Sequence, residues 1–304
     1  MMQIDLLAQA PLQLAQPDLS TQSLAQKQAR MTAQLRELGS ALVAFSGGVD
    51  SALVLAVALQ TLGHDRVLAV TAVSPSFPSW ELEACQRFVA TLGARHEIIS
   101  THEMEDPNYV RNNADRCYFC KTELYDILGP AAQAHGLAAV LNGLNWDDLG
   151  DHRPGARAGR EHGIISPLRD AGLTKADIRA WAQALGLAVW DKPALACLSS
   201  RIPYGTPVTL DTLRQIDAAE RHVRSLGLQQ VRVRHHGALA RIEVAPEELE
   251  AAFALRQQLD AGVRAAGYHY VTLDLRGYRS GSLNEGLQKS PAAPRQTESV
   301  ERAK

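Results

Sequence analysis

The residues with the clearest chemical potential form the hexapeptide Ser46–Ser51, with the sequence Ser-Gly-Gly-Val-Asp-Ser. Its two adjacent glycines allow a sharp turn and let backbone N–H groups approach a ligand closely. The apolar stretch that begins near Asp50 is long enough for a helix, whose positive N-terminal end would face the same turn. A turn of this kind binds phosphate. Asp50 can cap the helix or bind a Mg²⁺ ion that accompanies the phosphates.

This hexapeptide differs from two commoner phosphate-binding loops. It lacks the Gly-x-x-x-x-Gly-Lys-Ser/Thr pattern of a Walker loop and the Gly-x-Gly-x-x-Gly pattern of a dinucleotide-binding fingerprint. The simpler alternative is an ordinary strand-to-helix turn that happens to contain two glycines.

Three of the four cysteines lie in segments that suggest chemistry. Cys117 and Cys120 form a Cys-x-x-Cys pair at the start of an expected helix, which suits a redox couple, half of a zinc site or part of an iron–sulfur site. No second pair follows, which argues against a local zinc ribbon. Cys197 lies near Arg201, and a neighbouring cation lowers the pKa of a thiol and makes it a better nucleophile. Buried, inert thiols are the alternative, and Cys85 is expected in the core.

Two further groups of polar residues suggest ligand contacts. The loop after the fourth expected strand carries Asn145, Asp148 and Arg153, which suit Mg²⁺ and sugar or carboxylate recognition unless the loop is merely solvated. Arg232 and Arg234 alternate along another expected strand, so their guanidinium groups share one face and converge. The alternative for this pair is an ordinary solvated strand face.

An alternation of expected strands and helices positions these residues. Strands are expected at Ala41–Phe45, Val67–Ser74, His96–Thr101 and Ala138–Gly143, with two short ones at Ser166–Leu168 and Ala188–Lys192. This alternation predicts an α/β fold with a Rossmann-like parallel sheet, helices on both faces, and the ligand site at the carboxyl ends of the strands. Thr71, near the end of the second strand, is included among the expected nucleotide contacts for its position.

The chain divides by composition and pattern into five parts. We expect a flexible arm over residues 1–22, a nucleotide-binding domain over 23–193, a hinge loop with Cys197 over 194–209, a smaller α/β domain for substrate binding or oligomerisation over 210–287, and a disordered tail over 288–304.

Bulk composition argues against several classes of protein. The net charge of −2 gives no general attraction to nucleic acid, and no apolar run reaches the length of a membrane span. The first residues lack the pattern of a secretory signal, and four cysteines without such a signal indicate a reducing setting. We therefore expect a cytoplasmic protein that acts on a small molecule, without nucleic acid or membrane.

Several segments together resemble one enzyme family. Ser46–Ser51 resembles the PP-loop of the ATP pyrophosphatase superfamily, whose members split ATP between the α and β phosphates. The chain from about residue 42 to 284 resembles the LarE family through that loop and the later segments RCYFCK, LNGLNWDDLGDHRPG, ACLSSRIPYG, VRVRHHGALARIE and LDLRGYRSGSLN. LarE proteins are PP-loop sulfur transferases that build the nickel-pincer nucleotide cofactor of lactate racemase and related enzymes.

The resemblance implies a role for each candidate residue. ATP with Mg²⁺ would adenylate a carboxylate of pyridinium-3,5-biscarboxylic acid mononucleotide, and pyrophosphate would leave. The Cys197 thiolate would attack the acyl-adenylate, so that each carboxylate becomes a thiocarboxylate; Asp50 is the second catalytic residue. The implied ATP contacts are Ser46, Gly47, Gly48, Val49, Asp50, Ser51 and Thr71, the implied contacts to the substrate phosphate are Arg232 and Arg234, and the implied substrate and Mg²⁺ contacts are Asn145, Asp148, Arg153 and Arg201.

The family offers two sources of sulfur. In one branch a lone cysteine gives up its own sulfur and becomes dehydroalanine; in another, three cysteines hold a [4Fe–4S] cluster whose fourth iron is free to carry an extra sulfide. Cys117 and Cys120 beside Cys197 favour the cluster branch. Family members form ring-like assemblies, so a homo-oligomer is also expected.

Three other interpretations stay open from the sequence. A tRNA thiolase also uses a PP-loop, although the slightly acidic composition argues against RNA binding. An amidating synthetase such as NAD synthetase would not need Cys197. A non-catalytic nucleotide sensor would bind ATP without releasing pyrophosphate.

Overall fold

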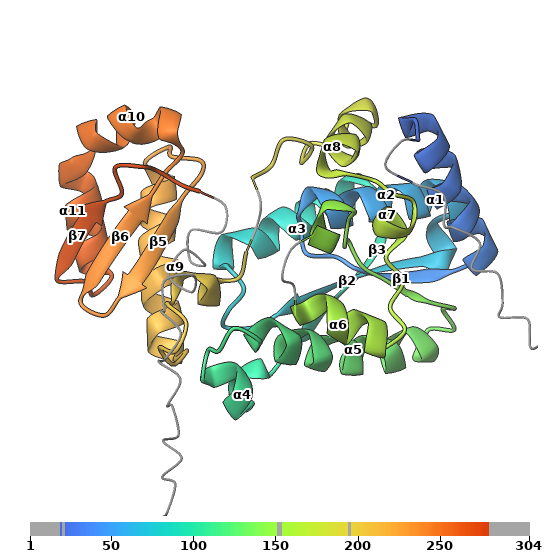
Figure 1. Cartoon of the computed structure of the whole chain (residues 1–304), viewed down its shortest axis with the longest axis horizontal. Coiled ribbons are helices and arrows are strands. Elements are labelled where there is room, and N and C mark those ends of the chain that lie inside the picture. Colours follow the sequence, from blue (N-terminus) through green and yellow to red (C-terminus); the bar gives the residue numbers. More distant parts are fainter. Residues whose placement is uncertain (1–18, 20–21, 151–153, 194–195, 280–304) are drawn as a thin grey trace, which may run out of the picture.

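The computed structural model describes residues 19, 22–150, 154–193 and 196–279 (Figure 1). The expected disordered tail over 288–304 lies outside the described residues, as does the expected flexible arm over 1–22, apart from residues 19 and 22. The helices of the described part of the chain are all too short or too polar to span a bilayer.

The larger unit is built on a parallel sheet of four strands in the order β3-β2-β1-β4. The strands are β1 (Ala41–Ala44), β2 (Val67–Val73), β3 (Arg95–Ser100) and β4 (Val140–Leu141). The chain places β2 and β3 on one side of β1 and then returns to place β4 on the other side. The strand order therefore reverses between β1 and β4, which is where ligands bind in open α/β sheets.

Alternate residues of the strands pack against helices on opposite faces. Ala41 and Val43 face a core shared with α1, α2, α3 and α8, whereas Leu42 faces a core shared with α5 and α6. Figure 1 shows α5 and α6 below the sheet and α1 and α2 above it. The helices of this unit are α1 (Leu24–Leu38), α2 (Val49–Leu62), α3 (Ser79–Thr91), α4 (Pro107–Val110), α5 (Arg116–Ala134), α6 (Pro154–Glu161), α7 (Pro167–Asp170) and α8 (Lys175–Ala184), with 3₁₀ turns at His64–Arg66, Glu103–Glu105 and Asp147–Gly150. The predicted doubly covered parallel sheet is confirmed.

Two short expected strands are absent from the described residues. The segment Ser166–Leu168 instead begins α7, because Pro167 at the first helical position has a backbone angle suited to a helix start. Only Ile165 keeps a strand-like contact, as a single bridge to Leu141. The segment Ala188–Lys192 is a turn.

The smaller sheet has three strands in the order β5-β6-β7 and stands beside the larger unit (Figure 1). The antiparallel hairpin of β5 (Arg232–His236) and β6 (Leu239–Glu243) turns at Gly237 with φ 64°. The parallel partner of β6 is β7 (Tyr270–Leu273). The helices are α9 (Leu210–Ser225), α10 (Leu249–Ala254) and α11 (Arg256–Ala265), and a 3₁₀ turn at Pro246–Glu248 precedes α10.

A separate apolar cluster joins the two units around the segment that follows Cys197. It includes Tyr109 of α4, Leu198 of a 3₁₀ turn (Leu198–Arg201) and Leu213 of α9. Asn112 reinforces this junction, because its side-chain amide donates to the carbonyl groups of Pro203 and Thr206 at 2.9 and 2.8 Å. The Cys197 loop is therefore held by the larger unit.

Candidate active site

The loop between β1 and α2 is shaped by its two glycines. Gly47 has φ 79°, and a Cβ atom at this position would lie 2.5 Å from the Cys85 sulfur, so that both the backbone and the packing require glycine. The Ser46 N–H donates to the Ser51 hydroxyl at 3.2 Å, and that hydroxyl donates to the Gly48 carbonyl at 3.1 Å. Gly48 is the N-cap of α2, so the N–H groups of the first turn of this helix face the loop. This geometry suits an anion.

Asp50 lies in the first turn of α2 and is held by two residues far away in sequence. Its Oδ1 accepts a hydrogen bond from the Asn145 amide at 3.3 Å, and its Oδ2 pairs with the ammonium group of Lys175. Lys175 is the first residue of α8, directly after the N-cap Thr174. The structure thus brings together Asp50 and Asn145, as expected, and adds a lysine at the same place.

The loop after β4 is ordered by its own polar side chains. Asn145 and Asp148 are buried, and the Asn145 N–H donates to Asp148 Oδ2 at 3.0 Å. A Cβ atom on Gly143 would lie 2.8 Å from the Ser51 backbone nitrogen, so this glycine lets the loop pack directly against the start of α2. Asp148 therefore shapes the loop, and Asn145 reaches Asp50.

The three candidate cysteines are electrostatically coupled. Cys117 and Cys120 lie three residues apart in the first turns of α5 and share one face of the helix. Burial raises the pKa of Cys120 to about 12, with smaller contributions from Glu103 and the Cys197 and Cys117 thiols. Desolvation of the thiol, followed by the nearby Cys197, likewise raises the pKa of Cys117, although the residue as a whole is exposed. The three thiols therefore lie close enough to influence one another.

The three thiols are the described side chains to consider for an iron–sulfur cluster. Within the described ranges, no group of three or more His, Cys, Asp or Glu side chains is arranged to hold one metal ion. In a [4Fe–4S] cluster each cysteine binds its own iron, so the thiolates need not converge on one point. Cys117 is exposed and the other two are partly exposed. Three cysteine thiols are the donors that could bind such a cluster here.

Arg116 is a buried cation next to this group of thiols. Its guanidinium donates to the Ser199 carbonyl at 2.9 Å and to the Asn112 side chain. Burial opposes its charge, yet the neighbouring Cys197 and Cys117 raise the pKa of Arg116 above its usual value. Arg116 partly offsets the rise in the pKa of Cys117 that burial and Cys197 cause.

Arg201 holds the backbone of Cys197. Its guanidinium forms two hydrogen bonds with the Glu220 carboxylate, at 2.7 and 2.8 Å, and donates to the Cys197 carbonyl at 2.9 Å. Burial opposes the charge of Arg201, but the Glu220 carboxylate raises its pKa. These contacts position the cysteine through its carbonyl oxygen.

Arg232 and Arg234 have different partners, although both lie on β5. Arg234 is buried against Glu243, at 2.8 Å, and also donates to the Ser200 carbonyl at 2.9 Å. The Arg232 guanidinium lies 5.2 Å from the centre of the Tyr278 ring. Burial and the charge of Arg201 lower the pKa of Arg232 to about 10, while the Glu220 carboxylate acts in the opposite direction. Both side chains lie near the Cys197 loop.

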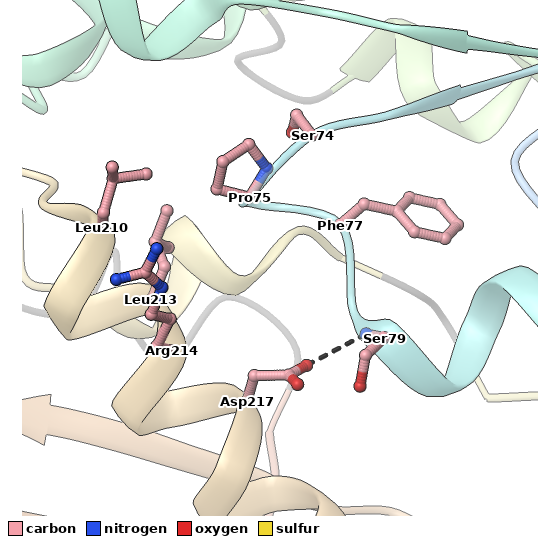
Figure 2. Close-up of a pocket in the computed structure, with 8 residues that line it drawn as sticks. All are labelled: Ser74, Pro75, Phe77, Ser79, Leu210, Leu213, Arg214 and Asp217. Carbon is pink, nitrogen blue, oxygen red and sulfur yellow. Dashed lines mark hydrogen bonds between the residues drawn. The ribbon is translucent and has the colours of Figure 1, made fainter.

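A pocket of about 310 Å³ lies between the segment after β2 and helix α9 (Figure 2). Asp217 of α9 accepts a hydrogen bond from the Ser79 N–H at 3.0 Å, which caps the start of α3 from the smaller unit. Pro75 and Leu213 flank the gap, with Arg214 beside it. Ser74, which its place at the end of the second strand makes a candidate for contacting adenine, lines this pocket, whereas the PP-loop residues and the three candidate cysteines do not.

Comparison with known proteins decides the family. The chain is 41% identical over 271 residues to the pyridinium-3,5-bisthiocarboxylic acid mononucleotide synthase of Lactiplantibacillus plantarum, with 89% of this chain and 98% of that protein covered. The chain belongs to the LarE family. It is an enzyme of the PP-loop type, and residues 24–113 match the family model described as NAD synthase.

Two further relatives differ in how much of this LarE-family chain they match. An uncharacterized protein of Synechocystis is 49% identical over 256 residues, covering 83% of this chain and 95% of its own length. The argininosuccinate synthase of Halobacterium salinarum is 28% identical over 148 residues, covering 45% of this chain and 37% of its own. The full-length matches therefore include the cysteine segments and the smaller sheet, whereas the partial match does not span the chain.

Some candidate residues of this LarE-family chain have positions that the sequence did not reveal. Thr71 is fully buried, and its hydroxyl donates to the Phe45 carbonyl at 3.0 Å, so it supports the PP-loop from below. Arg153 lies outside the described residues. Arg116, Lys175 and Lys192 were not predicted. Only Lys175 had a local signal, the capping box of Thr174 and Asp177 that marks a helix start, and this does not reveal its contact with Asp50.

Proposed function

We propose that the chain converts the carboxylates of pyridinium-3,5-biscarboxylic acid mononucleotide into thiocarboxylates, using ATP and releasing pyrophosphate. One observation carries the proposal: the Cys197 loop is anchored to the end of the PP-loop sheet, through a hydrogen bond of 2.8 Å from the Leu198 N–H to the Ser76 carbonyl. Ser76 follows β2, and the PP-loop follows the adjacent strand β1. An activated carboxylate and a thiol can thus meet at one edge of the sheet.

The activation step uses the start of α2. The N–H groups of the PP-loop and of the first helical turn, with the hydroxyls of Ser46 and Ser51, would bind the triphosphate. Asp50 would hold Mg²⁺, with Asn145 and Lys175 fixing its carboxylate. A substrate carboxylate oxygen attacks the α-phosphorus, pyrophosphate leaves, and the acyl-adenylate that forms carries AMP as a good leaving group.

The sulfur step uses the residues around Cys197. Without a cluster, the Cys197 thiolate would attack the acyl carbon of the adenylate, a C–S bond would form, and the C–O bond to AMP would break. The Cβ–S bond of Cys197 would then break by β-elimination, which releases the thiocarboxylate and leaves dehydroalanine. Arg201 would keep the Cys197 backbone in place through its hydrogen bond to the Cys197 carbonyl. Arg232, with its lowered pKa, is the residue we assign to the substrate phosphate, while Arg234 orders the loop through the Ser200 carbonyl.

The origin of the sulfur is a second part of the proposal. In the alternative that we favour, Cys117, Cys120 and Cys197 would hold a [4Fe–4S] cluster. When bound, this cluster would supply sulfide to the acyl-adenylate in place of the Cys197 thiolate, so that no protein cysteine is consumed. The presence of the Cys117 and Cys120 pair at the start of α5, in addition to Cys197, supports this assignment over a lone sacrificial cysteine. We also propose that residues 23–193 and 210–287 act as two domains joined by the 194–209 loop, within a homo-oligomer.

The activation step is tested by pyrophosphate release. The wild type with ATP and Mg²⁺ should release pyrophosphate only when the biscarboxylic mononucleotide is present, and Asp50→Asn should abolish the release while keeping the fold. The exposed Asp65 gives a matched control, because Asp65→Asn leaves the loop untouched. Release that persists in Asp50→Asn would contradict the assignment of the PP-loop, and binding of ATP with no release by the wild type would favour a nucleotide sensor.

A further inference from the structure

Lys192 contacts the PP-loop from the turn that follows α8. Its ammonium group donates to the Gly47 carbonyl at 3.1 Å and pairs with Glu81 Oε2 at 2.7 Å. The Glu81 side chain, on α3, is 6% exposed and the Lys192 side chain 21%. The lysine is therefore neutralised by a buried carboxylate and directed at one carbonyl of the loop.

That carbonyl determines where the next N–H points. The described chain has no cis peptide bond, so the Gly47 carbonyl and the Gly48 N–H lie on opposite sides of one planar trans unit. A carbonyl held by Lys192 therefore aims the Gly48 N–H away from the lysine. Because Gly48 is the N-cap of α2, this N–H joins those of the first helical turn.

The peptide between the two glycines needs such a restraint. Glycine has access to most backbone conformations, so a unit flanked by two glycines rotates easily. A rotated unit would present its carbonyl oxygen, a partial negative charge, to a bound phosphate. The other end of the loop is fixed separately, by the hydrogen bond of 3.2 Å from the Ser46 N–H to the Ser51 hydroxyl.

We propose that Lys192 is a positioning residue for ATP, which keeps the Gly47–Gly48 peptide oriented so that the Gly48 N–H faces the triphosphate. The inference rests on the ATP step proposed above and assigns a role that is separate from Asp50. Lys192 acts through the backbone, and its salt bridge with Glu81 leaves its charge balanced.

Nucleotide binding and stability, measured on the same variants, test this role. A non-hydrolysable Mg²⁺–ATP analogue is titrated by calorimetry into the full chain and into Lys192→Met, Lys192→Arg and Glu81→Gln, with thermal unfolding recorded for each. The control is Lys27→Met, which removes an ion pair of the same 2.7 Å length, between Lys27 and Asp177, away from the loop. Lys192→Met and Lys27→Met should both unfold at lower temperature.

Binding should separate the variants. We expect Lys192→Met to bind the analogue about tenfold more weakly, and Lys192→Arg, Glu81→Gln and Lys27→Met to stay within about threefold of the wild type, because the first two keep a donor at the Gly47 carbonyl. Unchanged binding by Lys192→Met would overturn the proposal, as would an equal loss in Glu81→Gln, which would assign the effect to the ion pair. A wild type that does not bind the analogue would overturn the ATP step itself and this role with it.

Discussion

Arg201 and Glu220 form a fully buried ion pair directly beneath the backbone of Cys197. Two hydrogen bonds of 2.7 and 2.8 Å join the guanidinium and carboxylate groups, and the exposed fractions of the side chains are 1% and 0%. The same carboxylate accepts the Val233 N–H of β5 at 2.9 Å. One pair thus connects the reactive loop, helix α9 and the smaller sheet.

Breaking this pair should be costly. Arg201→Met leaves the Glu220 carboxylate buried without its partner, and we expect the free energy of unfolding to fall by about 3–5 kcal/mol. The double variant Arg201→Met/Glu220→Leu should recover much of that loss. Urea denaturation measures both. The exposed pair of Arg87 and Glu83 is the control, since Arg87→Met should change stability by less than about 1 kcal/mol. An Arg201→Met loss as small as that of the control would contradict a structural role for the pair.

Arg232 should select for the phosphorylated substrate. Burial and Arg201 lower its pKa to about 10, so an anion that enters this site relieves unfavourable charge. Arg232→Ala should weaken binding of the mononucleotide at least about tenfold and leave ATP binding within about twofold, as calorimetry with each ligand would measure. The exposed Arg221 on α9 gives a control variant, Arg221→Ala, expected to change neither. Equal weakening of both ligands would remove Arg232 from the substrate site.

Three of the four cysteines should be required for binding of the iron–sulfur cluster. Anaerobic reconstitution of the wild type with iron and sulfide should give a brown protein with broad visible absorbance, and Cys117→Ser, Cys120→Ser and Cys197→Ser should each lose most of the bound iron. Cys85→Ala is the matched control, because this fourth cysteine is buried under the PP-loop and should leave the iron content unchanged. A colourless wild type whose Cys197 becomes dehydroalanine during turnover would favour the sacrificial branch.

Cys85 should make the fold sensitive to alkaline pH. Burial, with a smaller contribution from Glu81, raises its pKa from 9.0 to about 11. The folded protein therefore keeps the thiol protonated when the unfolded chain has lost the proton, and this contribution to stability is complete below pH 9 and lost as the pH rises to 11. The wild type should lose about 2–3 kcal/mol more than Cys85→Ala over this interval in urea denaturation. An equal loss in both proteins would contradict the shift.

The sequence was most informative where the structure depends on neighbouring residues. Glycines at 47 and 48 after an apolar strand predicted a phosphate-binding turn, and the turn has the required geometry because its backbone angles and its packing against Cys85 are local consequences of missing side chains. The parallel sheet was predicted because apolar strand segments alternate with helix-length segments along the chain, which is also a pattern between neighbours in sequence. The short strand expected at 166–168 was wrong because Pro167 starts a helix.

The ion pairs could not be predicted, since their members are far apart in the chain. Lys175 pairs with Asp50 across 125 residues, and Lys192 pairs with Glu81 across 111. Arg232 and Arg234 were expected to converge because they share a strand face. The register of the hairpin instead places Glu243 opposite Arg232, within reach of Arg234, so that the two guanidinium groups have different environments.

The mass of the reaction product tests the central claim most directly. The wild type is incubated anaerobically with ATP, Mg²⁺ and pyridinium-3,5-biscarboxylic acid mononucleotide, and the nucleotide is analysed by mass spectrometry beside the Cys197→Ala variant. We predict a product in which carboxylate oxygen is replaced by sulfur, formed only by the wild type and accompanied by pyrophosphate. A wild type that releases pyrophosphate without adding sulfur, or a Cys197→Ala variant that makes the same product, would contradict the account.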